Sequence, residues 1–292
     1  MKNIFEVKNL VYTYPKATIP TIHSICFQVK EGTIFGLLGP SGAGKSTTQK
    51  IMTKLLTNYE GEILYFGKDL KTYKKDFYEE VGVGFEMPVH FGKLTGRENL
   101  AYFASLYRRQ VDFVALMRRV GLEDAIDQEV GQYSKGMKVR LNFVRALLND
   151  PKVLFLDEPT NGLDPKNAKI IKDMILELKN QGRTIIITTH LMGDVEQLCD
   201  EVVFMRQGKI TEVATPRQLK LQYGRREVKV EYFNNNHVEH ETFAMNDLAH
   251  NPKFLAVLTQ NIQTIHSGET SLEDIFIKVI GGSSDETTTT SH

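Results

Sequence analysis

The stretch Gly39-Pro40-Ser41-Gly42-Ala43-Gly44-Lys45-Ser46-Thr47 fits the pattern GxxxxGK[ST]. It follows an apolar run, Thr33 to Leu38, that is typical of a buried strand, and a helical pattern comes after it. Glycines let backbone N–H groups turn inward around phosphate oxygens, and the helix adds the positive end of its dipole. The stretch therefore predicts a phosphate-binding loop, in which Lys45 reaches the β- and γ-phosphates of a nucleotide and Ser46 ligates Mg²⁺.

A second apolar stretch, Val153 to Leu156, ends in two carboxylates, Asp157 and Glu158. Beside a phosphate-binding loop this pattern is typical of a Walker B strand, in which the first carboxylate holds Mg²⁺ and the second polarises the attacking water. A solvated strand end is the alternative, and without the loop it would account better for two acidic residues. The loop favours the catalytic roles for Asp157 and Glu158.

The composition is that of an ordinary soluble globular protein. The chain has 292 residues, with 36 Lys plus Arg and 36 Asp plus Glu, so its formal net charge is zero. Dedicated nucleic-acid binders usually carry a basic surplus, so we expect no nucleic-acid partner. No apolar run approaches the roughly 18 residues that span a bilayer, and the start lacks the apolar core of a signal peptide. Cys26 and Cys199 lie far apart in the sequence, which fits a reducing cytoplasm.

Strand-like runs alternate with helical patterns from residue 3 to about 210, as in an α/β fold. Within this region, residues 94 to about 149 have a mostly helical pattern, which indicates a helical subdomain inserted into the core. We expect residues 1–215 to form one domain.

The pattern changes after residue 215. Residues 227–233 and 238–245 alternate like two strands, and Thr270 and Glu273 form a capping-box pattern before an amphipathic helix. We expect residues 216–281 to form a small C-terminal α+β appendage and residues 282–292, which are polar, to be a disordered tail.

Two further segments discriminate among nucleotide-binding proteins. Gln132-Tyr133-Ser134-Lys135-Gly136-Met137-Lys138 resembles the LSGGQ signature of ATP-binding cassette (ABC) proteins, and Thr188-Thr189-His190 resembles the switch histidine of that family. The order of motifs over residues 4–210 is similar to that of an ABC cassette. The resemblance implies an α/β P-loop NTPase fold with a mixed-sheet core plus antiparallel β and helical subdomains. It also implies that the chain binds ATP and Mg²⁺ and hydrolyses ATP.

The resemblance assigns roles residue by residue. Tyr14 resembles the aromatic side chain that stacks on adenine, with Tyr12 as the competing candidate. Asn161-Gly162-Leu163-Asp164 resembles the D-loop at the seam between two cassettes, and Asp164 also fits a helix N-cap. The catalytic roles go to Glu158, His190 and Lys45. The predicted nucleotide contacts are Tyr14, Gly39, Pro40, Ser41, Gly42, Ala43, Gly44, Lys45, Ser46, Thr47, Ser134 and Gly136, and the predicted metal ligands are Ser46, Glu86 and Asp157.

Two motifs depart from the family pattern. The signature has Lys135 where glycine is common and Met137 where glutamine is common, but it keeps Ser134 and Gly136 for contact with a γ-phosphate. The segment Gly84-Phe85-Glu86-Met87-Pro88 has Glu86 where the family's Q-loop has glutamine. Glutamate still offers an oxygen ligand to Mg²⁺, so we expect an active site.

The resemblance also implies partners. ATP held by one cassette is completed by the signature loop of a second, which is either a copy of this chain or a different cassette, and the pair drives a separate transmembrane permease subunit. The chain would then lie on the cytoplasmic face of the membrane through its permease. Aromatic residues after the Q-loop are either the lining of the permease-docking groove or core of the helical subdomain; they are Phe91, Tyr102, Phe103 and Tyr107.

Export is the favoured direction of transport. Thr270-Ser271-Leu272-Glu273-Asp274-Ile275-Phe276 resembles the C-terminal helix of drug, antibiotic and ABC-2 type exporter ATPases. An importer ATPase and a soluble ABC ATPase that acts on ribosomes or DNA are the alternatives; the neutral charge and the single cassette disfavour the second. His237 and His240 flank Glu239, a pattern that fits a solvated strand face better than a metal site.

Overall fold

The protein is described here by a computed structural model that covers residues 2–86, 90–109, 111–224, 226–234 and 237–281. The chain divides into two units, residues 1–215 and residues 216–292.

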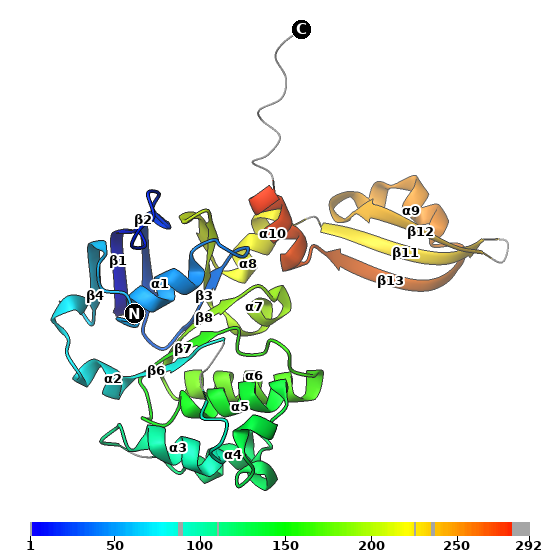
Figure 1. Ribbon diagram of the computed structural model, residues 1–292. Coiled ribbons are helices and arrows are strands. Elements are labelled where there is room, and N and C mark those ends of the chain that lie inside the picture. The colour runs from blue at the N-terminus through cyan, green and yellow to red at the C-terminus, as the bar shows by residue number, and fades with distance from the viewer. Residues whose placement is uncertain (1, 87–89, 110, 225, 235–236, 282–292) are drawn as a thin grey trace. The chain divides into compact units, whose positions relative to one another are not determined.

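The centre of the first unit is a six-stranded sheet with the order β10-β9-β3-β8-β7-β6 (Figure 1). Its strands are β3 (Ile34–Leu38), β6 (Val81–Gly84), β7 (Val153–Asp157), β8 (Thr184–Thr189), β9 (Glu201–Arg206) and β10 (Lys209–Ala214). All of them run parallel except β10, which pairs antiparallel with β9. Every residue of β3 and β8 is buried, as expected of apolar strands that are covered on both faces.

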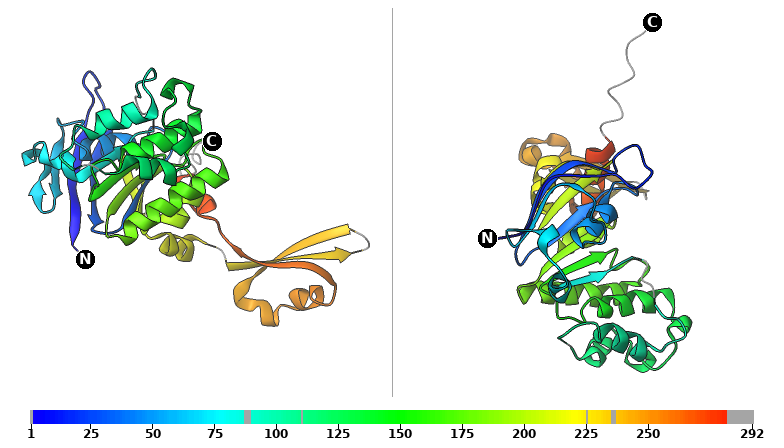
Figure 2. Two further views of the ribbon diagram at one scale, coloured as in Figure 1. Left: turned by 90° about the horizontal axis from the view of Figure 1, so that it is seen from below. Right: turned by 60° about the vertical axis from the view of Figure 1, so that its left-hand side comes forward.

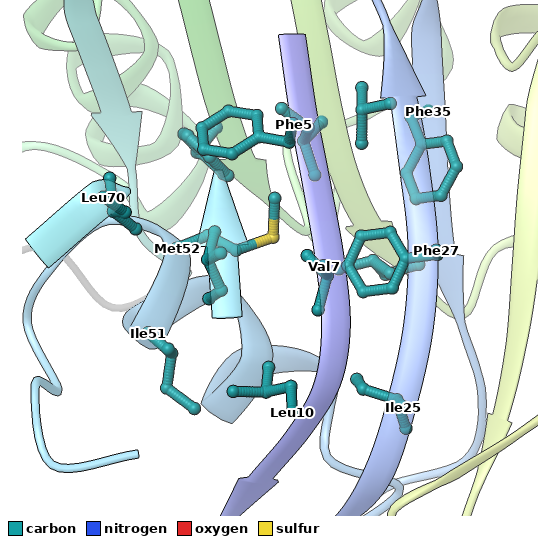
Figure 3. Close-up of a cluster of buried hydrophobic side chains, with 14 of the residues drawn as sticks. Phe5, Val7, Leu10, Ile25, Phe27, Phe35, Ile51, Met52 and Leu70 are labelled. Carbon is teal, nitrogen blue, oxygen red and sulfur yellow. The ribbon is translucent and has the colours of Figure 1, made fainter. Parts of the chain in front are cut away.

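A second, antiparallel sheet has the order β2-β1-β4-β5. Its strands are β1 (Asn3–Tyr12), β2 (Ile22–Lys30), β4 (Glu60–Tyr65) and β5 (Lys68–Asp69). The alternating burial of β2 shows one face turned to the core and one to solvent. Figure 3 shows Phe5, Val7 and Phe27 of this sheet pointing into a cluster that also takes Ile51 and Met52 from the first helix. The phosphate-loop helix is thus anchored in apolar packing between the sheets.

The helices of the first unit lie on both sides of its central sheet. They are α1 (Lys45–Met52), α2 (Asp76–Glu80), α3 (Gly96–Ala104), α4 (Phe113–Arg119), α5 (Lys135–Arg145), α6 (Pro165–Asn180) and α7 (Met192–Leu198), with short 3₁₀ turns η1 (Leu70–Thr72), η2 (Glu123–Ala125) and η3 (Val130–Gln132). Figure 1 and the right-hand view of Figure 2 show α3, α4 and α5 grouped at the end of this unit opposite the antiparallel sheet.

The second unit contains a three-stranded antiparallel sheet of order β12-β11-β13. Its elements are α8 (Pro216–Tyr223), β11 (Arg226–Asn234), β12 (His237–Ala244), η4 (Met245–His250), α9 (Pro252–Val257), β13 (Asn261–Glu269) and α10 (Leu272–Gly281). One face of the sheet packs with α9 around Val230, Tyr232 and Phe243, and α10 packs against α8. The left-hand view of Figure 2 shows α9 along that face.

Two details of the second unit differ from the sequence-based expectation. The hydroxyl that caps α10 belongs to Ser271, which accepts a hydrogen bond from the Asp274 N–H at 3.1 Å and donates to Asp274 Oδ2 at 2.6 Å. The cap is therefore formed by Ser271 and Asp274, one residue later than the expected pair Thr270 and Glu273. α10 begins at Leu272, so Ser271 occupies the N-cap position. The expected disordered tail, residues 282–292, lies outside the described residues.

Candidate functional site

Four neighbouring parallel strands each end at a predicted site residue. Gly39 follows β3, Glu158 follows β7, His190 follows β8, and Glu86 comes two residues after β6. Because these strands are parallel and adjacent, their carboxyl ends meet at one edge of the sheet. This edge is where open α/β sheets bind ligands. The fold thus gathers residues that are far apart in the sequence.

The glycine-rich loop is shaped by close packing and by left-handed backbone. A Cβ atom on Gly39 would lie 2.3 Å from the Met205 carbonyl oxygen, so only glycine fits there. Gly42 has a φ of 78° and nothing within 4 Å of a Cβ position, so its backbone faces open space. α1 then begins at Lys45 and directs its first N–H groups back toward the loop. This is the backbone arrangement of an anion-binding loop.

Lys45 is hydrogen-bonded to its own loop. Its Nζ donates to the carbonyl oxygens of Gly39 at 2.7 Å and Pro40 at 3.0 Å. Burial lowers the pKa of the Lys45 ammonium, whereas the neighbouring carboxylates, that of Glu158 foremost, act to raise it.

A hollow of about 510 Å³ lies at this edge. Its lining consists of Thr21, Ser41, Gly42, Ala43, Gly44, Lys45, Ser46, Thr47, Glu86, Asp157, Glu158 and His190. Backbone N–H groups and an ammonium on one side face carboxylates on the other. A nucleotide's phosphates and a hard cation fit this donor set, because Mg²⁺ is usually bound by one or two carboxylates together with substrate phosphates.

Glu158 and His190 form a hydrogen-bonded pair. Glu158 Oε1 lies 2.7 Å from His190 Nδ1, and Thr189 Oγ1 donates to Glu158 Oε2 at 3.0 Å. Glu158 has a φ of 50°, an uncommon left-handed conformation for a residue other than glycine, and its N–H donates to the Thr188 carbonyl at 2.8 Å. The carboxylate is almost fully buried, while the imidazole is half exposed. The pair can orient and deprotonate a water at the end of the hollow.

Asp157 is partly buried and hydrogen-bonded to Thr188, whose hydroxyl donates to Asp157 Oδ1. Burial raises the pKa of Asp157, while the bond from Thr188 opposes that rise and the charge of Glu86 adds to it. A bound cation would favour the ionised form of Asp157.

The structure separates the two tyrosine candidates. Tyr12 is buried within the core of the first unit, with its ring edge against Tyr14 at 4.9 Å between centroids. Tyr14 is only partly buried, and its hydroxyl lies 3.1 Å from Thr47 Oγ1 at the end of the phosphate loop. The Tyr14 hydroxyl thus contacts a residue that lines the hollow, although Tyr14 is not itself among the lining residues.

The signature residues lie apart from the hollow. Ser134 is the N-cap of α5, where its hydroxyl accepts from the Met137 N–H at 3.2 Å, and Gly136 follows in the first turn. Lys135 extends along the D-loop of its own chain: a Cβ on Gly162 would lie 3.0 Å from Lys135 Cε. Asp164 caps α6 and is followed by Pro165 at the first helical position.

Sequence reasoning missed Thr21, Gln49, Thr188 and Thr189. Gln49 lies in a helix, where a polar residue is ordinary, so its burial left no signal in the sequence. Thr188 and Thr189 are ordinary strand residues by propensity, so nothing in the sequence marked their hydroxyls as partners of carboxylates.

Comparison with known proteins decides the family. Residues 22–161 match the family model described as ABC transporter, and residues 226–269 match the model described as fluoroquinolone efflux ABC transporter C-terminal domain. A fluoroquinolones export ATP-binding protein of Mycobacterium tuberculosis is 48% identical over 281 residues, which cover 95% of this chain and 93% of that protein. The chain belongs to the ABC transporter ATP-binding proteins. The resemblance inferred from its motifs is confirmed, and with it the ABC-type ATPase class.

A second relative and a solved structure are also similar to this chain over most of its length. The bacitracin transport ATP-binding protein of Bacillus licheniformis is 32% identical and covers 97% of this chain and 99% of its own. The solved structure of an ATP-binding subunit of an ABC transporter has a TM-score of 0.69 at 29% identity, over 75% of this chain and 93% of that chain. The predicted cassette fold is thereby confirmed.

The described residues were also compared with the requirements of a membrane-spanning helix and of a metal-binding cluster. No helix there has both the length and the apolar character needed to cross a bilayer. In the same residues no group of three or more His, Cys, Asp and Glu side chains is arranged to hold a metal ion.

Proposed function

We propose that this ABC protein hydrolyses ATP with Mg²⁺ at the carboxyl edge of its central sheet and thereby powers the export of an antibiotic-like small molecule through a separate transmembrane subunit. The observation that carries the chemistry is the Glu158–His190 pair, 2.7 Å apart and facing the phosphate loop across one hollow. Export as the direction of transport is supported by the 48% identity to a fluoroquinolones export protein, together with the matched C-terminal domain.

Each residue has a defined part. The loop from Gly39 to Thr47, with its backbone N–H groups and Lys45, would hold the phosphates, and the Tyr14 ring would stack on adenine. Ser46, Asp157 and Glu86 would hold Mg²⁺, which neutralises charge on the transferred phosphoryl group. Glu158 takes the proton of the attacking water, and His190 keeps Glu158 in place and faces the γ-phosphate.

A second cassette completes the site. Ser134 and Gly136 lie away from the hollow of their own chain, so we assign them to the γ-phosphate held by the partner cassette. The D-loop that carries Asn161 would lie at the seam of this pair.

The permease would dock on an exposed aromatic surface of the helical subdomain. Phe91 and Tyr102 are 43% and 50% exposed and meet edge to face at 5.2 Å, and Leu106, four residues after Tyr102, is 62% exposed. Phe103 and Tyr107 are partly buried; the guanidinium of Arg145 lies 4.8 Å from the centre of the Phe103 ring. Phe91 and Tyr102 are therefore the better candidates for partner contact, and Phe103 and Tyr107 pack the subdomain.

The substitution Glu158→Gln tests the catalytic assignment. It should leave ATP binding unchanged and reduce hydrolysis by about 10²–10⁴-fold, the usual loss on removing a general base. ATP should then trap a dimer that elutes earlier in size-exclusion chromatography. Glu60→Gln, the same change at an exposed strand residue, should behave as the wild type. Turnover at the wild-type rate in Glu158→Gln would refute the assignment.

Export is tested in cells. The chain is co-expressed with a candidate transmembrane subunit, and uptake of a fluorescent fluoroquinolone is followed with and without Glu158→Gln. Lower accumulation that depends on intact Glu158 is expected. Equal accumulation in both strains would contradict fluoroquinolone export.

A further inference from the structure

Gln49 is a buried amide for which the catalytic scheme has no role. It lies in α1, one turn after Lys45, and is only 1% exposed. Its Oε1 lies 3.3 Å from Thr188 Oγ1, and its Nε2 has no hydrogen-bond partner among the described residues. A buried amide that leaves its donors unused destabilises the fold, so the arrangement of this group must have a physical cause.

Thr188 connects this amide to the carboxylate of Asp157. The hydroxyl is completely buried and contacts Gln49 Oε1 and Asp157 Oδ1, of which the carboxylate oxygen is the closer. A hydroxyl has one hydrogen, and an ionised carboxylate only accepts, so that hydrogen goes to Asp157. The contact with Gln49 is then a hydrogen bond only if Gln49 is the donor.

A half turn of the Gln49 amide provides that donor. The two ends of an amide have nearly the same shape, so the nitrogen occupies the position 3.3 Å from Thr188 Oγ1 after the turn. One N–H group then has a partner, the Thr188 oxygen accepts one hydrogen bond while its hydrogen is donated onward, and the carbonyl oxygen of Gln49 takes the position that has no partner among the described residues. The result is a series of hydrogen bonds, all donated in the same direction, from α1 to the end of β7.

We propose that Gln49 is a positioning residue for the metal-holding aspartate: its amide N–H donates to Thr188, the Thr188 hydroxyl donates to Asp157 Oδ1, and Oδ2 is left to face the hollow. The inference rests on the proposed function, since it takes Asp157 as the residue that holds Mg²⁺. It ties the helix that carries the phosphate loop to the strand that carries the aspartate, without either Gln49 or Thr188 touching nucleotide or metal. Partners of this kind fix a ligand's orientation, and their loss typically weakens metal binding by about 10–100-fold.

The experiment measures metal affinity directly. Mn²⁺, observed by its EPR signal, is titrated into the ADP complex of the full chain, and the Mg²⁺ concentration for half-maximal ATP hydrolysis is measured in parallel. Gln49→Met keeps the volume and removes the donor. It should weaken Mn²⁺ binding and raise the Mg²⁺ requirement by about tenfold, while ATP binding without metal stays within about twofold.

Three variants complete the test. Thr188→Val removes the hydroxyl and should weaken Mn²⁺ binding as much as Gln49→Met or more, the double variant should be no weaker than Thr188→Val alone, and Thr188→Ser should restore wild-type affinity. Thr53→Val, which removes another buried hydroxyl of the α1 end, should lower stability without changing metal affinity. If Gln49→Met does not fold, Gln49→Leu takes its place, and the comparison of Thr188→Val with Thr188→Ser tests the Thr188 hydroxyl.

The outcomes separate the two proposals. Unchanged Mn²⁺ affinity in Gln49→Met, or equal affinities of Thr188→Val and Thr188→Ser, overturns the role of Gln49 and Thr188. If Asp157→Asn also leaves Mn²⁺ affinity unchanged, the proposed metal site itself is wrong. Weak binding in Asp157→Asn with normal binding in Gln49→Met overturns only the present inference.

Discussion

At the scale of single residues, the side chains that hydrogen-bond to the carboxylates define the site as much as the carboxylates do. Glu158 is held by His190 and Thr189, and Asp157 is held by Thr188. The motif pattern predicted the acidic residues and the histidine, because such residues at the ends of apolar strands are typical of a site that faces a phosphate loop. It could not predict the threonines, because β-propensity alone accounts for a threonine in a strand.

Glu86 puts a negative charge where the resemblance predicts a neutral glutamine. It lines the hollow, and its carboxylate acts on the pKa of both Lys45 and Asp157. Glu86→Gln removes a negative charge next to the metal position, so the Mg²⁺ requirement of hydrolysis should rise. ATP affinity should change by less than about tenfold, or roughly 1.4 kcal/mol. Nucleotide titration paired with hydrolysis over a Mg²⁺ series measures both.

Glu86→Ala should lower transport-coupled turnover and leave ATP binding near normal. Glu60→Gln is the matched control for a lost surface charge. Hydrolysis unchanged at every Mg²⁺ concentration in both Glu86 variants would place this residue outside the active site.

At the scale of elements, the strands of the central sheet were the most predictable part. A continuous apolar run such as Thr184 to Thr188 is typical of a strand that is buried on both faces. The hairpin of β11 and β12 also follows the expected alternation. β13 was missed, because Asn261–Glu269 is largely polar and pairs with β11 through its backbone, which leaves little signature in side-chain type. The cap of α10 was misplaced by one residue, because Thr270 and Ser271 are both good capping residues.

Ser271 offers a test of that correction. Ser271→Ala removes the hydrogen bond to the Asp274 N–H, and losing an N-cap typically costs about 1 kcal/mol. Amides of α10 should therefore exchange with deuterium roughly fivefold faster, while ATP binding by the first unit is unaffected. Glu273→Gln should have no effect on exchange. Unchanged exchange in Ser271→Ala together with faster exchange in Glu273→Gln would instead support a cap formed by Thr270 and Glu273.

At the scale of the whole molecule, the residues of the hollow and those of the second unit belong to different parts of the chain. All of the residues that line the hollow belong to residues 1–215, and α10 packs against α8 within residues 216–281. We propose that the first unit is the complete ATP-binding cassette and that the second supports dimerisation or regulation. Removal of residues 216–292 should thus spare ATP binding.

The same deletion in the Glu158→Gln background should weaken the ATP-trapped dimer, seen as a smaller dimer peak in size-exclusion chromatography at equal protein concentration. Full-length Glu158→Gln is the reference. Loss of ATP binding by the shortened chain would show that the division into two parts is wrong.

The order of strands in the central sheet has a consequence for biosynthesis. β3, which leads into the phosphate loop, has β8 on one side and β9 on the other, and both are encoded after residue 183. While the ribosome is still adding the middle of the chain, β3 therefore lacks both of its neighbours in the sheet, and its four apolar side chains remain uncovered. The nascent chain can acquire a nucleotide pocket only after β8 has inserted between β3 and β7. Until then the exposed strand is a target for chaperones and for aggregation.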